Sequence, residues 1–94
     1  MTKQHRLIRT DGTEQLLGHR PTLDEIRRLI SCDCMDTVTI DRRLQTVMFV
    51  DDTGMVDGKP VNQKATTLYH AICKPNTIHQ IHGDVLIVDE RGAP

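Results

Sequence analysis

The chain contains 94 residues, of which 37% are hydrophobic and only 2% are aromatic. It carries 12 Lys plus Arg against 13 Asp plus Glu, so its formal net charge is −1 with neutral histidines. This length has room for one small domain spanning residues 1–94, whose core we place at about residues 5–90. The near-zero charge excludes a wholesale electrostatic attraction to nucleic acid or to an anionic membrane.

The sequence favours a cytoplasmic protein without a membrane partner. No stretch approaches the roughly 18 consecutive apolar residues of a membrane helix, and the first residues lead into no apolar signal segment. Cys32, Cys34 and Cys73 form an odd set. The Cys-x-Cys pair is also too close for comfortable disulfide geometry, so we expect reduced thiols.

The first turn signal in the chain is Asp11-Gly12, which lies between two apolar pairs, Leu7-Ile8 and Leu16-Leu17. This pattern predicts an opening β-hairpin with a two-residue type I′ turn.

A helix should follow the hairpin after Pro21-Thr22, because Thr22 can cap it and Glu25 completes a capping box. The apolar residues predicted to share one face of this helix are Leu23, Ile26, Leu29 and Ile30.

Two strands should come next. Residues 37–41 alternate between polar and β-branched apolar types, which predicts a strand that buries Val38 and Ile40 on one face. Residues 45–50 end in a run of four apolar side chains, Val47 to Val50, which predicts a strand covered on both faces.

The second helix should begin at an Asn62 cap, with Ala65, Leu68, Tyr69 and Ile72 on its apolar face. The apolar run at 85–88 predicts a final, central strand. The element order is therefore ββαββαβ, an α+β fold in which two helices cover one face of a mostly antiparallel sheet. A β-grasp-like arrangement is one topology that fits this order.

Three segments carry a resemblance to a known family. They are Arg9-Thr10-Asp11-Gly12-Thr13, Gly58-Lys59-Pro60-Val61-Asn62-Gln63-Lys64-Ala65-Thr66 and Ile81-His82-Gly83-Asp84-Val85-Leu86-Ile87. Together they resemble an uncharacterised family of short domains carried by phages, plasmids and their bacterial hosts. The resemblance implies a small intracellular mobile-element protein and no catalytic residue. That family usually carries a glycine pair directly after the first helix, where this chain has Ser31-Cys32-Asp33-Cys34, so the turn there should differ.

Two metal sites can be read from the sequence, and we favour neither. Cysteine and histidine ligands suit zinc, and a tetrahedral site could draw on Cys32, Cys34, His70, Cys73, His79 and His82. One buried cysteine explains the His70-x-x-Cys73 spacing equally well. The acidic run at 51–58 lacks the closing glutamate of a calcium loop and is read as a solvated turn. We therefore expect no metal and no cofactor.

The candidate ligand-binding residues lie at the start of the second helix: Asn62, Lys64, Thr66 and Thr67. Helix N-termini favour phosphate groups because of the aligned peptide dipoles, and a lysine in the first turn adds positive charge. Capping by Asn62 alone would be the structural explanation of the same pattern.

These patterns favour a non-enzymatic binding module rather than a catalyst, since no nucleophile elbow and no phosphate-loop motif occurs. We expect it to sequester a small phosphorylated or nucleotide-like ligand, or to contact a host protein in an anti-defence role. Homodimerisation would supplement its modest core. Nucleic acid is disfavoured because only Phe49 and Tyr69 could stack on bases. The alternatives are a small metal-dependent hydrolase and a zinc-stabilised nucleic-acid-associated protein.

Overall fold

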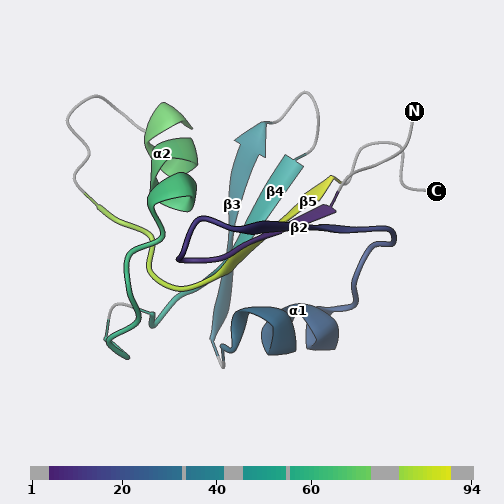
Figure 1. Cartoon of the computed structure of the whole chain (residues 1–94), viewed down its shortest axis with the longest axis horizontal. Helices are drawn as coiled ribbons and strands as arrows, with labels where there is room; N and C mark the ends of the chain where they lie inside the picture. The colour runs from purple at the N-terminus through teal and green to yellow at the C-terminus, as the bar shows by residue number, and fades with distance from the viewer. Residues whose placement is uncertain (1–4, 33, 42–45, 55, 73–78, 90–94) are drawn as a thin grey trace.

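A computed structural model describes residues 5–32, 34–41, 46–54, 56–72 and 79–89 of the chain. Within these residues the fold consists of five strands and two helices (Figure 1). They are, in chain order, β1 (His5–Ile8), β2 (Glu14–Leu17), α1 (Leu23–Ile30), β3 (Met35–Asp41), β4 (Thr46–Asp51), α2 (Gln63–Ile72) and β5 (Val85–Asp89). The predicted α+β class and the ββαββαβ order are confirmed.

The strands form one sheet in the order β2-β1-β5-β4-β3, and every neighbouring pair is antiparallel. β5 is the central strand, as its apolar run predicted. It pairs antiparallel with β1, with Leu86 opposite Leu7. A β-grasp fold would join its first and last strands in parallel, so that interpretation is wrong.

The two helices lie on opposite faces of the sheet, and the expectation that both cover one face is wrong. Figure 1 shows α1 below the sheet and α2 above it. The cause is the alternation of side chains along the buried strands. On β5, Leu86 packs in the cluster that contains Ile26 of α1, whereas its neighbour Ile87 packs in the cluster that contains Ala65 of α2.

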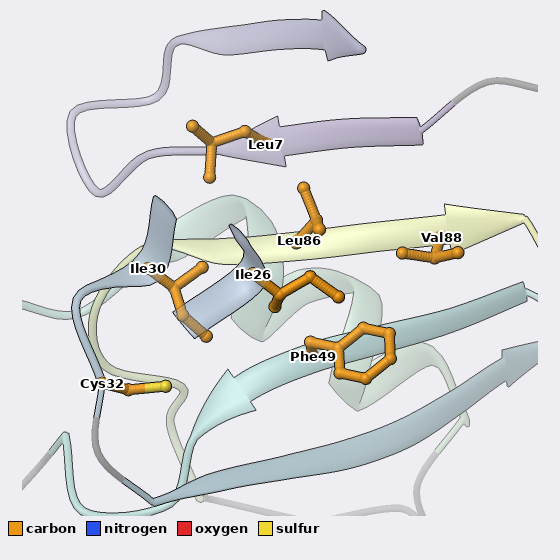
Figure 2. Close-up of a cluster of buried hydrophobic side chains, with 7 residues drawn as sticks. All are labelled: Leu7, Ile26, Ile30, Cys32, Phe49, Leu86 and Val88. Carbon is orange, nitrogen blue, oxygen red and sulfur yellow. The ribbon is translucent and has the colours of Figure 1, made fainter. Parts of the chain in front are cut away.

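The fold therefore has two hydrophobic layers separated by the sheet. Figure 2 shows the layer on the α1 side, formed by Leu7, Ile26, Ile30, Cys32, Phe49, Leu86 and Val88. The layer on the α2 side is formed by Ile8, Met48, Val50, Ala65, Ile81, Val85 and Ile87. β4 and β5 contribute to both layers, which explains why their sequences are apolar without alternation.

Helix α1 begins as its sequence predicted. The Thr22 side chain accepts a hydrogen bond from the Glu25 backbone N–H, and Glu25 accepts one from the Thr22 N–H, which completes the capping box. Leu23 departs from the prediction, since it is 54% exposed at the first position of the helix. The helix ends at Ser31, whose φ of 53° is the left-handed conformation that glycine adopts most easily.

The β1–β2 turn also departs from its prediction. A type I′ turn needs a positive φ at both central residues, but in Asp11-Gly12 only Gly12 has one, at 92°. The Gly12 N–H instead donates to the carbonyl of Arg9, and the Arg9 N–H donates to the carbonyl of Thr13. This is a three-residue loop, and it places Glu14 opposite Ile8.

Candidate functional site

The four predicted ligand residues separate into a buried pair and an exposed pair. Asn62 has no exposed surface. Its amide nitrogen donates to the carbonyls of Ile8 (3.0 Å) and Gly83 (3.1 Å), and its side-chain oxygen caps α2 by accepting from the Ala65 N–H (3.0 Å). These bonds tie α2 to the ends of β1 and β5, so the side chain has a structural task.

Thr66 is the other buried member, with 6% of its surface exposed. Its hydroxyl accepts from the Ile81 N–H at 2.9 Å and lies 3.5 Å from the Ile81 carbonyl, to which it can donate. A ligand at the start of α2 would therefore reach neither Asn62 nor Thr66 without breaking buried hydrogen bonds.

Lys64 and Thr67 lie at the surface, where they line a groove between α2 and the β1–β2 hairpin. The groove has a volume of about 250 Å³, and we call it the cation groove; it is lined by Arg6, Ile8, Glu14, Lys64, Thr67 and Leu68. The Thr67 hydroxyl donates to the Gln63 carbonyl at 2.9 Å. The structure thus gathers two of the predicted residues in one place and adds two charged residues from the hairpin.

Glu14 bridges the two cations of this groove. One carboxylate oxygen lies 3.0 Å from the Arg6 Nη1, and the other lies 2.8 Å from the Lys64 Nζ. The hydrogen bond from Lys64 and the positive charges of Lys64 and Arg6 lower the pKa of the Glu14 carboxyl, outweighing the opposing effect of burial. Two positive charges face a single negative one, so the groove retains a net charge of +1.

The floor of the cation groove is apolar. Ile8 is fully buried beneath it, and Leu68 of α2 is partly buried in the same hydrophobic layer. Leu16, which lies directly opposite Arg6 in the hairpin, is 64% exposed. The groove therefore combines charged rims with an apolar base, an arrangement that suits a ligand having an anionic end and an apolar body.

A second cavity of about 170 Å³ opens on the α2 side, near the end of β4. Its polar lining consists of Asp36, Asp51, Asp52, Tyr69, His79, Gln80 and His82. Two of the nearby imidazoles bond to backbone: His82 Nδ1 lies 2.8 Å from the Lys59 carbonyl oxygen, and His70 Nε2 lies 2.6 Å from the His79 carbonyl oxygen. These contacts hold the segment before β5 against α2 and against the segment that precedes α2.

The residues considered for zinc do not converge among those that the structure describes. Cys32 is buried in the α1-side layer, whereas His70 belongs to α2 on the other face of the sheet. Cys34 is exposed, and Cys73 lies outside the described residues. Within the described ranges no three histidine, cysteine or acidic side chains are grouped as metal ligands.

No helix in the described part of the chain is both long and apolar enough to span a bilayer.

Lys59 connects the segment before α2 to β4 and to the end of α1. Its ammonium group donates to Asp51, at the end of β4, and to the carbonyls of Ile30 and Ser31, at the end of α1. The Asp51 side chain is nearly inaccessible and also accepts from the Thr53 N–H at 3.0 Å. Every donor of the ammonium group can thus be matched to an acceptor, which makes this buried ion pair a structural anchor.

Comparison with known proteins identifies the family. A model described as a domain of unknown function, DUF3846, matches residues 3–93. The chain belongs to the DUF3846 family. No curated protein and no solved structure matches it. This membership confirms the resemblance to an uncharacterised domain family. The match covers nearly the whole chain.

Sequence reasoning missed Arg6 and Glu14 of this DUF3846 domain, and the turn explains why. A two-residue turn would have placed Glu14 opposite Arg9, whereas the observed loop places it opposite Ile8. A shift of one residue in register moves a side chain to the other face of a sheet. A predicted three-residue loop ending at Gly12 would have placed Glu14 on the face of the sheet that carries α2.

Proposed function

We propose that this domain is a non-enzymatic binding module that sequesters a small phosphorylated or nucleotide-like ligand in the cation groove. The observation that carries the proposal is the pair of cations, Arg6 and Lys64, held at one site by the two oxygens of Glu14. A phosphate group presents the same kind of acceptor oxygens to arginine and lysine.

The cost of opening the Glu14 bridge supports this proposal. The side chains of Arg6, Glu14 and Lys64 are each between 31% and 49% exposed. Ion pairs exposed to this extent contribute little to the stability of a fold, because water and salt screen their charges. A ligand phosphate carrying a charge of about −1.5 to −2 can therefore replace the carboxylate without endangering the fold.

The size of the groove supports a small ligand. Its volume of about 250 Å³ lies just below the range of about 300–1,000 Å³ that is usual for ligand pockets. A mononucleotide could place its phosphate between the cations and lay its sugar or base along Ile8 and Leu68. A larger oligonucleotide would extend beyond the lining residues.

We propose binding without chemical alteration because of the roles that the lining side chains already have. The Glu14 carboxylate is held by both cations, and the Thr67 hydroxyl donates to the backbone of its own helix. Among the described residues, the contacts of these two groups join neither of them to a base that would activate it as a nucleophile, which is what covalent catalysis requires. Two cations and an apolar floor are sufficient for recognition.

We extend the proposal to the biological setting: a cytoplasmic protein of phage or plasmid origin that withholds a phosphorylated defence signal from the host. The support for this part is the resemblance of its motifs to domains carried by mobile elements. Removing a signal by binding alone requires neither a metal nor a cofactor, which suits a chain of 94 residues.

The test is calorimetry of the purified domain against a panel of mononucleotides. We expect binding that weakens about tenfold in Lys64→Gln, since one of two phosphate contacts of about 1.4 kcal/mol would be lost. Arg27→Gln is the matched control, because it removes one exposed cation from α1 on the opposite face. Flat titrations throughout, or equal losses in the two variants, would contradict the proposal.

Contact with a host protein, or with a second copy of the chain, is the second candidate. It is favoured by β2, which within the described part of the chain is an edge strand paired with β1 and which exposes 64% of Leu16. Such an edge can add a strand from a partner. Sedimentation at high protein concentration distinguishes the cases, since self-pairing predicts a dimer that Leu16→Lys dissociates. A monomer at high micromolar concentration would exclude self-pairing.

A further inference from the structure

We infer that two copies of the chain pair antiparallel along β2, with Leu16 of one copy directly opposite Leu16 of the other. The two sheets then form one continuous sheet across a two-fold axis at Leu16. This pairing is a specific form of the second candidate function, on which it rests, and it names both the partner and the register. It does not depend on a ligand in the cation groove.

The hydrogen bonds of the hairpin show which backbone groups of β2 face a partner. The Arg9 N–H donates to the Thr13 carbonyl at 2.9 Å, so these two residues form a hydrogen-bonded pair beside the loop. Hydrogen-bonded and non-hydrogen-bonded pairs alternate along an antiparallel ladder. The next hydrogen-bonded pair therefore contains Gln15, whereas Glu14 and Leu16 direct their N–H and carbonyl groups towards the outer edge.

A two-fold axis limits how two such edges can meet. Residues directly opposite each other in an antiparallel pair point to the same face of the sheet, so a symmetric pairing must have one residue opposite its own copy. An axis at Glu14 or Leu17, the two ends of β2, would put half of the contact beyond the strand. An axis at Glu14 would also set two like charges directly opposite each other, which is destabilising. The remaining centres are Gln15 and Leu16.

Charge and exposure favour Leu16 as the centre. With Gln15 at the axis, the two Glu14 side chains would be diagonal neighbours about 7–8 Å apart. With Leu16 at the axis, they lie four residues out of register, roughly 13 Å apart along the strands. The 64% exposed Leu16 side chain then covers its own copy. Gly18 comes to lie opposite Glu14 of the second copy, and a Cβ atom added at Gly18 would meet no atom within 4 Å, so the space for that side chain is open.

The same pairing brings two cation grooves to one face. The axis is perpendicular to the sheet, so α2 of both copies lies on the same side of it. Arg6 lies directly opposite Leu16 within each hairpin. The row across the seam is therefore Arg6 and Leu16 of one copy, followed by Leu16 and Arg6 of the other. Three strand spacings of about 4.8 Å separate the two Arg6 backbones, or roughly 14 Å. Each groove thus gains an apolar neighbour from the second copy.

The contact is small, so the dimer should be weak. Interfaces that bury less than about 1,200 Å² in total are typical of weak and transient association. For a seam of one strand pair we expect a dissociation constant on the order of 100 μM. Sedimentation of the wild-type chain over a concentration series up to the high micromolar range measures this association.

Cysteine cross-linking tests the register in the full chain. Three variants, Glu14→Cys, Gln15→Cys and Leu16→Cys, are made in a background that carries Cys34→Ser and Cys73→Ser. Cysteines directly opposite each other on paired strands have Cα atoms about 4.5–5.5 Å apart, which a disulfide can span. Diagonal cysteines lie beyond about 7 Å, which a disulfide cannot span without backbone movement.

We expect one variant to stand out under mild oxidation with oxidised glutathione. At a protein concentration of about 100 μM, Leu16→Cys should form a disulfide-linked dimer about tenfold faster than Gln15→Cys or Glu14→Cys, because pairing raises the local thiol concentration into the millimolar range. The matched control is Val56→Cys in the same background. Val56 is 84% exposed beyond the end of β4, so this variant measures the rate of random collision.

The outcomes separate the register from self-association. A concentration-dependent dimer together with preferential cross-linking of Leu16→Cys would support the inference. A dimer in which Gln15→Cys or Glu14→Cys reacts faster, or in which none of the three variants exceeds Val56→Cys, would overturn the inference and leave self-association standing. A wild-type chain that stays monomeric at high micromolar concentration would overturn both the inference and self-pairing, and would leave ligand binding in the cation groove unaffected.

Discussion

Asp51 and Lys59 illustrate how a charged pair can be placed inside a small domain. The Asp51 side chain is 1% exposed and that of Lys59 is 23% exposed. Burial alone would raise the pKa of the Asp51 carboxyl, but hydrogen bonds from Lys59 and Thr53 more than offset this, and the pKa is lowered from its usual 3.8. The same lysine satisfies two carbonyls at the end of α1, so the pair joins β4 to that helix.

The lowered pKa predicts how stability depends on pH. Because the folded pKa lies below the unfolded one, the stabilisation by Asp51 is present above the unfolded value near 3.8 and is lost as the pH falls from there through the lower, folded pKa. Asp51→Asn should lower the free energy of unfolding by about 2–3 kcal/mol at neutral pH, since it leaves the Lys59 charge without its counter-ion.

Urea denaturation from about pH 7 to pH 3 measures the difference in unfolding free energy between the wild type and Asp51→Asn. This difference should shrink with acidification. The exposed neighbour provides the control, and Asp52→Asn should follow the wild-type profile. A gap between wild type and Asp51→Asn that stays constant down to pH 3 would mean that Asp51 makes no ionic contribution.

At the scale of elements, the helix starts were predictable and their placement was not. Thr22 and Glu25 lie three residues apart, and Asn62 precedes Ala65 by the same spacing, so both caps could be recognised locally. The contacts of Asn62 with Ile8 and Gly83 span 54 and 21 residues, and no local pattern encodes them. For the same reason the sequence named Lys64 and Thr67 as candidates but did not name Arg6, which is linked to Lys64 through Glu14.

Two substitutions at Asn62 distinguish a cap from a connector. Asn62→Ala should destabilise the fold by about 3 kcal/mol, because it removes the cap and a buried donor to two carbonyls. Asn62→Asp keeps the capping oxygen but turns an acceptor towards the Ile8 and Gly83 carbonyls, so it should cost at least as much.

Thermal and urea unfolding of both variants measure these losses, with Thr22→Ala, a cap exposed to solvent, expected to cost about 1 kcal/mol. If Asn62→Asp were as stable as the wild type, capping would be the whole role of the residue.

For the whole molecule, the decisive property is that one sheet serves two hydrophobic layers. The sequence predicted the buried strands correctly, since the uninterrupted apolar runs of β4 and β5 are typical of strands covered on both sides. It did not predict that one helix covers each face of the sheet. That arrangement depends on how the chain crosses from one edge of the sheet to the other, which is a property of the complete topology.

The shared strands predict that the two layers unfold together. Ile26→Ala in the α1-side layer should lower the free energy of unfolding by about 2–5 kcal/mol. Tyr69 lies on the α2 side and is the only tyrosine in a chain without tryptophan, so its fluorescence reports the opposite layer.

We expect the tyrosine emission and the far-ultraviolet circular dichroism of this variant to give the same transition midpoint. A tyrosine transition that kept its wild-type midpoint while the dichroism shifted would show that the layers are independent.

The two free edges of the sheet differ, and this difference limits how copies of the chain could assemble. Along β3 the pairing with β4 shifts register between Thr39 and Asp41, and such an irregularity twists an edge away from a further strand. The pairing of β2 with β1 is regular over all four of its residues. Fibre growth needs two complementary surfaces on every copy. A molecule with one receptive edge can pair through that edge with only one other copy. Edge-to-edge pairing of copies would therefore stop at a closed dimer.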